Sequence, residues 1–88
     1  MVYVTARHME GGGYHEHIVS VRWRDPSTAA TGQSLRAQMV EWIRGGGQAF
    51  VQQGTLTVAV GVIDATPPYI RTYADGIWTD NLLALPTY

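Results

Sequence analysis

The chain contains no cysteine and no lysine, and only 15% of its 88 residues are charged. Without cysteine it can form neither a disulfide framework nor a thiolate zinc site, so an oxidising compartment is not implied. A chain of this length holds one hydrophobic core and buries roughly 60% of the surface of the unfolded chain. We therefore expect a single domain over residues 1–88 that is stabilised by packing or by a second subunit.

Long apolar runs are also missing. The longest uncharged apolar segment, Leu56 to Ile63, is interrupted by Thr57 and Gly61 and is far shorter than the ~20 residues that a membrane-spanning helix needs. Residues 1–8 alternate between apolar and polar, unlike the basic region and continuous apolar stretch of a signal peptide. We therefore expect no membrane partner and a protein that stays in the cytoplasm.

Charge of one sign is not in excess. Six arginines and seven acidic residues give a net charge of −1 with neutral histidines. This balance argues against a strongly basic nucleic-acid-binding protein, whose affinity rests largely on the neutralisation of phosphates. The exclusive use of arginine has two interpretations. It reflects either a GC-rich genome or planar recognition, because a guanidinium group pairs bidentately and stacks on rings.

Two strands are predicted before any helix. Residues 2–8 favour a strand, Gly11 to Gly13 form a flexible turn, and His15 to Arg24 alternate with the period of a half-buried strand. One side of this second strand carries Val19, Val21 and Trp23, and the other carries Ser20, Arg22 and Arg24. We therefore expect a hairpin with a loose loop.

One helix is predicted in the middle of the chain. Asp25-Pro26-Ser27 is a turn, followed by a loop to about Gln33. Ser34 is a favourable N-cap residue, and the triple glycine from Gly45 to Gly47 ends the helix. An apolar stripe at the helical period lies between them, made of Leu35, Met39, Trp42 and Ile43. The helix is therefore expected to present one apolar face to a sheet.

Four short strands are predicted after the helix. Gln48 to Gln52 and Leu56 to Ile63 form one hairpin, and the second strand of this pair is rich in valine. Tyr69 to Ala74 and Ile77-Trp78 form another hairpin around Asp75-Gly76. This dipeptide is the strongest hairpin signal in the chain, because a type I′ turn needs positive φ at both central residues.

The predicted order of elements is β-β-α-β-β-β-β. Because strands and helix are segregated, this order indicates an α+β domain with a single helix packed on one face of a small antiparallel sheet. The apolar C-terminal segment Leu82 to Pro86 is expected to pack back onto the body. One helix covers one face of such a sheet and leaves the other to solvent or to a partner.

Catalytic or metal chemistry has one candidate. His15 and His17 are expected on the same face of a strand with His8 across the hairpin, and such a set of imidazoles can bind zinc or support a hydrolase. The alternative interpretation is three exposed polar residues at a hairpin end. The chain has no cysteine and no glycine-flanked serine of the elbow type to serve as a nucleophile. We therefore expect a non-enzymatic protein without a cofactor.

The most distinctive feature is the interleaving of arginine and aromatic residues in two predicted strands. The candidate partner-binding residues are Arg22, Arg24, Tyr69, Arg71, Tyr73 and Trp78. If both strands have the same orientation, the open face of the sheet carries three arginines and two tyrosines. This composition is typical of protein-interface hot spots and of platforms that stack single-stranded nucleic acid. The alternative is solvated arginines beside half-buried tyrosines.

Three stretches of the chain resemble a known family. They are Val21-Arg22-Trp23-Arg24, Ser34 to Ile43, and Tyr69 to Pro86 with the sequence YIRTYADGIWTDNLLALP. The family comprises small proteins from actinobacteria and their phages and is a domain of unknown function. The resemblance covers nearly the whole chain and implies a free-standing domain with no recognised cofactor, located in the cytoplasm or, if phage-encoded, in the host cytoplasm.

The favoured hypothesis is a small non-enzymatic interaction module, a phage or bacterial accessory protein that docks a protein partner or itself through the arginine and aromatic face. A homodimer is its simplest form, because a sheet with one helix can cover its open face or an edge strand with a second copy. The first alternative is a module that binds single-stranded nucleic acid, and the second is a metal site or hydrolase built on the histidines.

Overall fold

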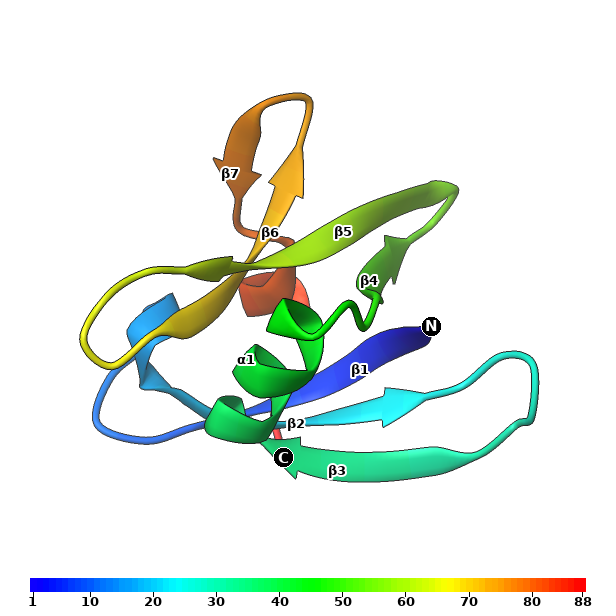
Figure 1. The fold of residues 1–88 in the computed structure, drawn as a ribbon, viewed down its shortest axis with the longest axis horizontal. Coiled ribbons are helices and arrows are strands. Elements are labelled where there is room, and N and C mark those ends of the chain that lie inside the picture. The colour runs from blue at the N-terminus through cyan, green and yellow to red at the C-terminus, as the bar shows by residue number, and fades with distance from the viewer.

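The computed structural model describes residues 1–88 and contains one seven-stranded sheet with the strand order β3-β2-β1-β4-β5-β6-β7 (Figure 1). The strands are β1 (Val2–Met9), β2 (Ile18–Arg24), β3 (Thr31–Leu35), β4 (Ala49–Gln53), β5 (Leu56–Ile63), β6 (Tyr69–Ala74) and β7 (Ile77–Thr79). The helical elements are the helix α1 (Arg36–Arg44) and two 3₁₀ turns, η1 (His15–His17) and η2 (Asn81–Ala84). None of these helices is long and apolar enough to cross a membrane.

The predicted α+β class with one helix is confirmed, but the order of elements differs in detail on both sides of α1. Before the helix, Thr31–Leu35 is the strand β3 and not a loop. After the last hairpin, Thr87 forms a parallel bridge with Arg7. The C-terminal segment thus packs onto the body as predicted, and Leu82 is fully buried there.

The strand β3 explains why the predicted N-cap is wrong. Ser34 lies in β3, where its Oγ accepts a hydrogen bond from Trp23 Nε1 at 3.1 Å. The helix starts later, and Gln38 Oε1 accepts a hydrogen bond from the Leu35 N–H at 2.8 Å. Gly32 allows the Trp23 ring to lie over β3, because an added Cβ would come within 2.3 Å of the ring. The backbone groups along this side of β2 are hydrogen-bonded because β3 pairs with β2.

The sheet is mixed, whereas an antiparallel sheet was predicted. The strands β1 and β4 pair in parallel, and every other pair is antiparallel. The cause is the crossover through α1, which returns the chain to the end of the sheet where β1 begins. Only two residue pairs join these strands, Val2↔Ala49 and Tyr3↔Phe50. Beyond them the sheet opens into a first half (β1–β3) and a second half (β4–β7).

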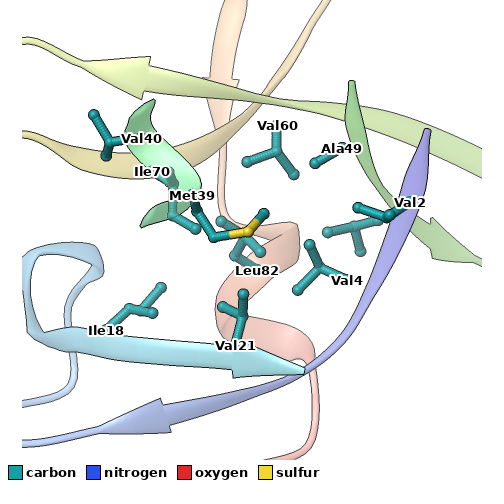
Figure 2. Packing of buried hydrophobic residues seen from close by; sticks show 11 residues of the cluster. Val2, Val4, Ile18, Val21, Met39, Val40, Ala49, Val60, Ile70 and Leu82 are labelled. Carbon is teal, nitrogen blue, oxygen red and sulfur yellow. The ribbon is translucent and has the colours of Figure 1, made fainter. Parts of the chain in front are cut away.

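The core lies between the two halves. Figure 2 shows the side chains of Ile18 and Val21 on β2 and those of Val60 and Ile70 in the second half pointing into the same interior. The helix α1 packs against strands of both halves, and η2 does the same with β1, β4 and β6. The sheet therefore encloses its core by folding over it, with α1 and η2 filling the remaining openings.

The predicted apolar stripe of α1 is partly correct. Met39 is buried and Ile43 packs against the core. Leu35 belongs to β3 and is exposed, and the Trp42 ring lies over Gly47 at the end of the helix. Val40, which was outside the predicted stripe, is buried instead. The stripe is rotated because the interior lies between two half-sheets and not over one flat face.

Candidate binding surfaces

The six predicted partner-binding residues fall into two groups on opposite halves of the sheet. Arg22 and Arg24 lie on β2, whereas Tyr69, Arg71 and Tyr73 lie on β6. Trp78 lies on β7 beside them. Three strands separate β2 from β6. Because the inner faces of the two halves point toward one core (Figure 2), their outer faces point away from each other. The two groups do not form one continuous surface.

Both arginines of β2 are occupied by contacts within the chain. The Arg22 guanidinium carbon lies 4.1 Å from the centre of the Tyr88 ring. The Arg24 guanidinium carbon lies 4.8 Å from the centre of the Tyr3 ring, and its Nη2 donates to Gln52 Oε1 at 3.3 Å. Cation–π contacts of this kind contribute about 0.5–1 kcal/mol at exposed sites. We refer to this outer face of β1 and β2 as the arginine surface.

The C-terminal residue Tyr88 covers part of the arginine surface. Its phenolic oxygen shares a 2.7 Å hydrogen bond with Ser20 Oγ, and its backbone oxygen is bonded to His8 Nδ1. The Tyr88 N–H donates to the Arg7 carbonyl oxygen at 3.1 Å, where β1 no longer pairs with β4. Ser20 is consequently buried, although it was predicted on the open side of β2. Sequence reasoning missed Tyr88, because its partners are 66 and more positions away.

The second group forms a continuous surface, which we call the aromatic face: Tyr69, Arg71, Tyr73 and Trp78 on the outer side of β6 and β7. Tyr73 and Trp78 are directly paired across the hairpin, with ring centres 5.0 Å apart and planes at 67°. They remain 43% and 38% exposed. An edge-to-face pair of this kind is fixed by the backbone and by ring electrostatics.

The neighbouring strand makes room for the aromatic face. Gly61 on β5 pairs with Arg71, and an added Cβ at Gly61 would lie 3.1 Å from Trp78 Cη2. The indole ring therefore lies flat enough over β5 to occupy the space that a side chain would take. The turn that precedes Trp78 has φ of 52° at Asp75 and 81° at Gly76, which confirms the predicted Asp-Gly hairpin.

Arg71 is fixed at the border of the aromatic face. Its Nε donates to the Thr79 carbonyl oxygen at 3.1 Å, and its Nη2 donates to Asp80 Oδ1 at 2.8 Å. Beneath it, buried Thr72 Oγ1 donates to the Thr79 carbonyl oxygen and accepts from the Asn81 N–H at 3.1 Å. These bonds connect β6 to the start of η2 and set the position of Asp80.

A pocket of about 480 Å³ adjoins the aromatic face. Its lining residues are Tyr14, His15, Glu16, Tyr69, Arg71, Asp80 and Leu83. The His15 side chain is almost fully buried, and its Nε2 has no hydrogen-bond partner and lies 3.9 Å from Asp80 Oδ1. Burial, and after it the charge of Arg71, lowers the pKa of His15. We call this site the His15 pocket. Neither Asp80 nor Tyr14 was among the site residues predicted from the sequence.

The three histidines lie in three different environments. His8 is bonded to Tyr88, His15 lies in the His15 pocket, and the His17 ring packs against Gly12. No group of three or more histidine, cysteine, aspartate or glutamate residues is arranged to hold a metal ion. His15 and His17 belong to η1 and not to a strand as predicted. The loop closes there through a 2.9 Å hydrogen bond from the His17 N–H to the Tyr14 carbonyl oxygen.

Comparison with known proteins identifies a family. No curated protein and no solved structure matches the chain. A family model described as "Protein of unknown function (DUF3892)" matches residues 3–86. The match begins at the second residue of β1, continues through η2, and includes the three stretches on which the resemblance was based. The chain therefore belongs to the DUF3892 family of proteins of unknown function.

Proposed function

We propose that the chain is a small non-enzymatic interaction module that binds a protein partner through the aromatic face. The observation that supports this most is the Tyr73–Trp78 pair, two large rings held edge to face on the outer side of β6 and β7 and left partly exposed. Tyrosine, tryptophan and arginine are the residues that contribute most often to the affinity of protein interfaces.

Binding of a partner to the aromatic face should cost little side-chain entropy. Tyr73 and Trp78 are placed by cross-strand pairing, and Arg71 is held by its bonds to Thr79 and Asp80. Each rotamer-rich side chain that a partner has to immobilise costs about 0.5–1.5 kcal/mol. Because these side chains are already fixed, more of the contact energy remains for affinity.

The proposed biological setting rests on the resemblance noted in the sequence. We propose an accessory protein of an actinobacterium or of one of its phages that acts in the cytoplasm. A second copy of the chain is the simplest protein partner, since the short edge strand β7 (Ile77–Thr79) lies next to the aromatic face and has a free edge.

The proposal is tested with the double variant Tyr73→Ala/Trp78→Ala. The matched control is Leu56→Ala, which removes a 64% exposed side chain from the opposite side of β5. Both proteins are checked for folding by circular dichroism and thermal unfolding. A partner captured by the wild-type chain is then purified and titrated by calorimetry against all three proteins.

We expect the double variant to lose at least about tenfold in affinity, which corresponds to ~1.4 kcal/mol. Leu56→Ala should bind like the wild type. Equal affinity of the double variant and the wild type would refute the proposal. Two further measurements distinguish other ligands of the aromatic face. Sedimentation shows whether the chain binds a second copy of itself. Binding of single-stranded DNA that weakens steeply with salt would favour nucleic acid as the ligand.

A further inference from the structure

The His15 pocket is assembled from three parts of the chain. Tyr14, His15 and Glu16 come from the η1 region, Tyr69 and Arg71 from β6, and Asp80 and Leu83 from the η2 region. Its position next to the aromatic face is fixed, because Tyr69 and Arg71 belong to both. A partner that covers the aromatic face therefore also reaches the mouth of the pocket.

Charged groups in the lining favour a positively charged ligand. Glu16 and Asp80 contribute two carboxylates, against the single guanidinium of Arg71. Arg71 is already engaged by Asp80 and by the Thr79 carbonyl oxygen. His15 is neutral near pH 7, because burial lowers its pKa. The lining residues themselves carry one more negative than positive charge. Arg7 also acts on His15, but it is not part of the lining, because its Nη2 donates to the Leu83 carbonyl oxygen at 2.6 Å. A cation that enters the pocket therefore meets the carboxylates of Glu16 and Asp80.

Two tyrosine rings add a second attraction for a cation. Tyr14 is 71% exposed at the rim, and Tyr69 lines the pocket from β6. Ammonium and guanidinium groups are attracted to the faces of aromatic rings within about 6 Å, and the gain grows as the cation loses water. The aliphatic stem of a lysine or arginine side chain can also pack on Leu83, which offers apolar surface in the same lining.

An unsatisfied group points to a ligand at the same place. The His15 side chain is 6% exposed, yet its Nε2 lacks a partner. Buried polar groups are almost always hydrogen-bonded in proteins. The 3.9 Å separation between Nε2 and Asp80 Oδ1 is too long for a direct hydrogen bond. An N–H donor group entering between them would bond to the carboxylate and to the neutral imidazole.

We propose that the His15 pocket binds a positively charged side chain, arginine or lysine, of the protein that docks on the aromatic face. That the side chain comes from a docked partner rests on the proposed function. The preference of the pocket for a cationic group does not, and it is tested without any partner. The carboxylates of Glu16 and Asp80 hold the charge, and the rings of Tyr14 and Tyr69 pack against the stem or the cationic group.

The test is a titration of the full ¹⁵N-labelled chain, followed by NMR at pH 7.5 and constant ionic strength. The probes are the N-acetyl amides of arginine, lysine, glutamine and glutamate. We expect saturable shifts of the Tyr14, Glu16 and Asp80 amides with arginine amide, lysine amide or both. The glutamine and glutamate amides should leave these signals in place. Absence of saturable shifts with both cationic probes, or equal shifts with glutamine or glutamate amide, would overturn the proposal.

Charge variants complete the test. Glu16→Gln and Asp80→Asn should each weaken binding of the cationic probe roughly 1.5- to fivefold, the range for an exposed ion pair. Asp75→Asn at the hairpin turn makes the same change of charge outside the pocket and should have no effect. If Asp75→Asn weakens binding as much as the pocket variants do, the pocket is not the site.

The two proposals fail in distinguishable ways. Tyr73→Ala/Trp78→Ala does not alter the lining of the pocket, so it should leave amide binding unchanged while it weakens partner binding. If the amides do not bind but the double variant still loses the partner, only the pocket proposal is wrong. If the amides bind but the double variant retains full affinity for the partner, the proposed function is wrong.

Discussion

The arginine surface and the aromatic face are made of the same residue types and differ in what their side chains contact. On the arginine surface, Arg22 lies over the ring of Tyr88 and Arg24 over the ring of Tyr3. On the aromatic face, Arg71 pairs with Asp80, and the rings of Tyr73 and Trp78 contact each other and stay partly exposed. We therefore expect interleaved arginine and aromatic residues to serve binding only where no other part of the chain covers the rings.

This difference predicts that the first surface stabilises the fold and the second serves binding. The sharpest stability test is Tyr88→Ala, which removes the ring under Arg22 and the hydrogen bond to Ser20. We expect the free energy of unfolding to fall by about 2–3 kcal/mol in urea denaturation. Tyr73→Ala, the matched change on the aromatic face, should cost less than ~1 kcal/mol. Equal losses would remove the distinction.

Loss of the hydrogen bonds made by the buried Thr72 hydroxyl in the second half should also lower the free energy of unfolding. Thr72→Val keeps the shape of a fully buried side chain but removes the hydroxyl that accepts from the Asn81 N–H and donates to the Thr79 carbonyl oxygen. We expect a loss of about 1–3 kcal/mol, because buried partners are left unpaired. Thr72→Ser, which retains the hydroxyl, should recover part of it. Hydrogen exchange at Asn81 should accelerate in the valine variant alone.

A smaller change displaces the exposed ring of the aromatic face. Gly61→Ala places a methyl group 3.1 Å from Trp78 Cη2 and 3.2 Å from Cζ3, so the indole ring has to shift. We expect a stability loss of about 1 kcal/mol and a change in the NMR signal of the Trp78 indole N–H. Gly46→Ala is unsuitable as a control because φ there is +105°. Gly13→Ala has open space and should leave the Trp78 signal unchanged.

The smallest predicted effect is a dependence of stability on pH. The pKa of His15 is lowered from 6.5 in the folded chain, first by burial and then by Arg71. The unfolded chain therefore binds more protons, and stability falls as the pH drops below 6.5. The charged groups around His15 are Arg71, Asp80, Glu16 and Arg7.

His15→Gln should flatten this part of the stability curve between pH 7 and pH 5, measured by urea denaturation at each pH. Asp25 supplies a contrast, since its pKa is lowered from 3.8 by hydrogen bonds from Ser27 and its effect belongs to a more acidic range. A curve that keeps its slope in His15→Gln would show that another group is responsible.

Local signals in the sequence predicted the parts of the fold that depend on local chemistry. Asp75-Gly76 predicted the last hairpin because the turn needs positive φ at both positions. The triple glycine from Gly45 to Gly47 predicted the end of α1 for a similar reason. The apolar segment Leu82 to Pro86 predicted that the C-terminus packs back onto the body, and Leu82 is fully buried there.

Non-local features were not predictable in this way. The strand β3 has little apolar pattern of its own and depends on pairing with β2 and on the Trp23 ring over Gly32. The parallel pairing of Val2 with Ala49 depends on where the crossover returns the chain. The short pairing of β1 with β4 also places Arg22 and Arg71 on different halves of the sheet, so the predicted common surface is in fact two separate surfaces. The roles of Tyr88 and Asp80 depend on contacts formed only after folding.

The aromatic face and the arginine surface can be compared in one binding measurement. Purified partner is titrated by calorimetry against Tyr73→Ala/Trp78→Ala and against Arg22→Ala/Arg24→Ala, each verified as folded. If the partner binds the aromatic face, the first variant should lose affinity at least roughly tenfold and the second should change it less than about twofold. An equal or larger loss for the arginine variant would contradict binding at the aromatic face and would place the partner on β2.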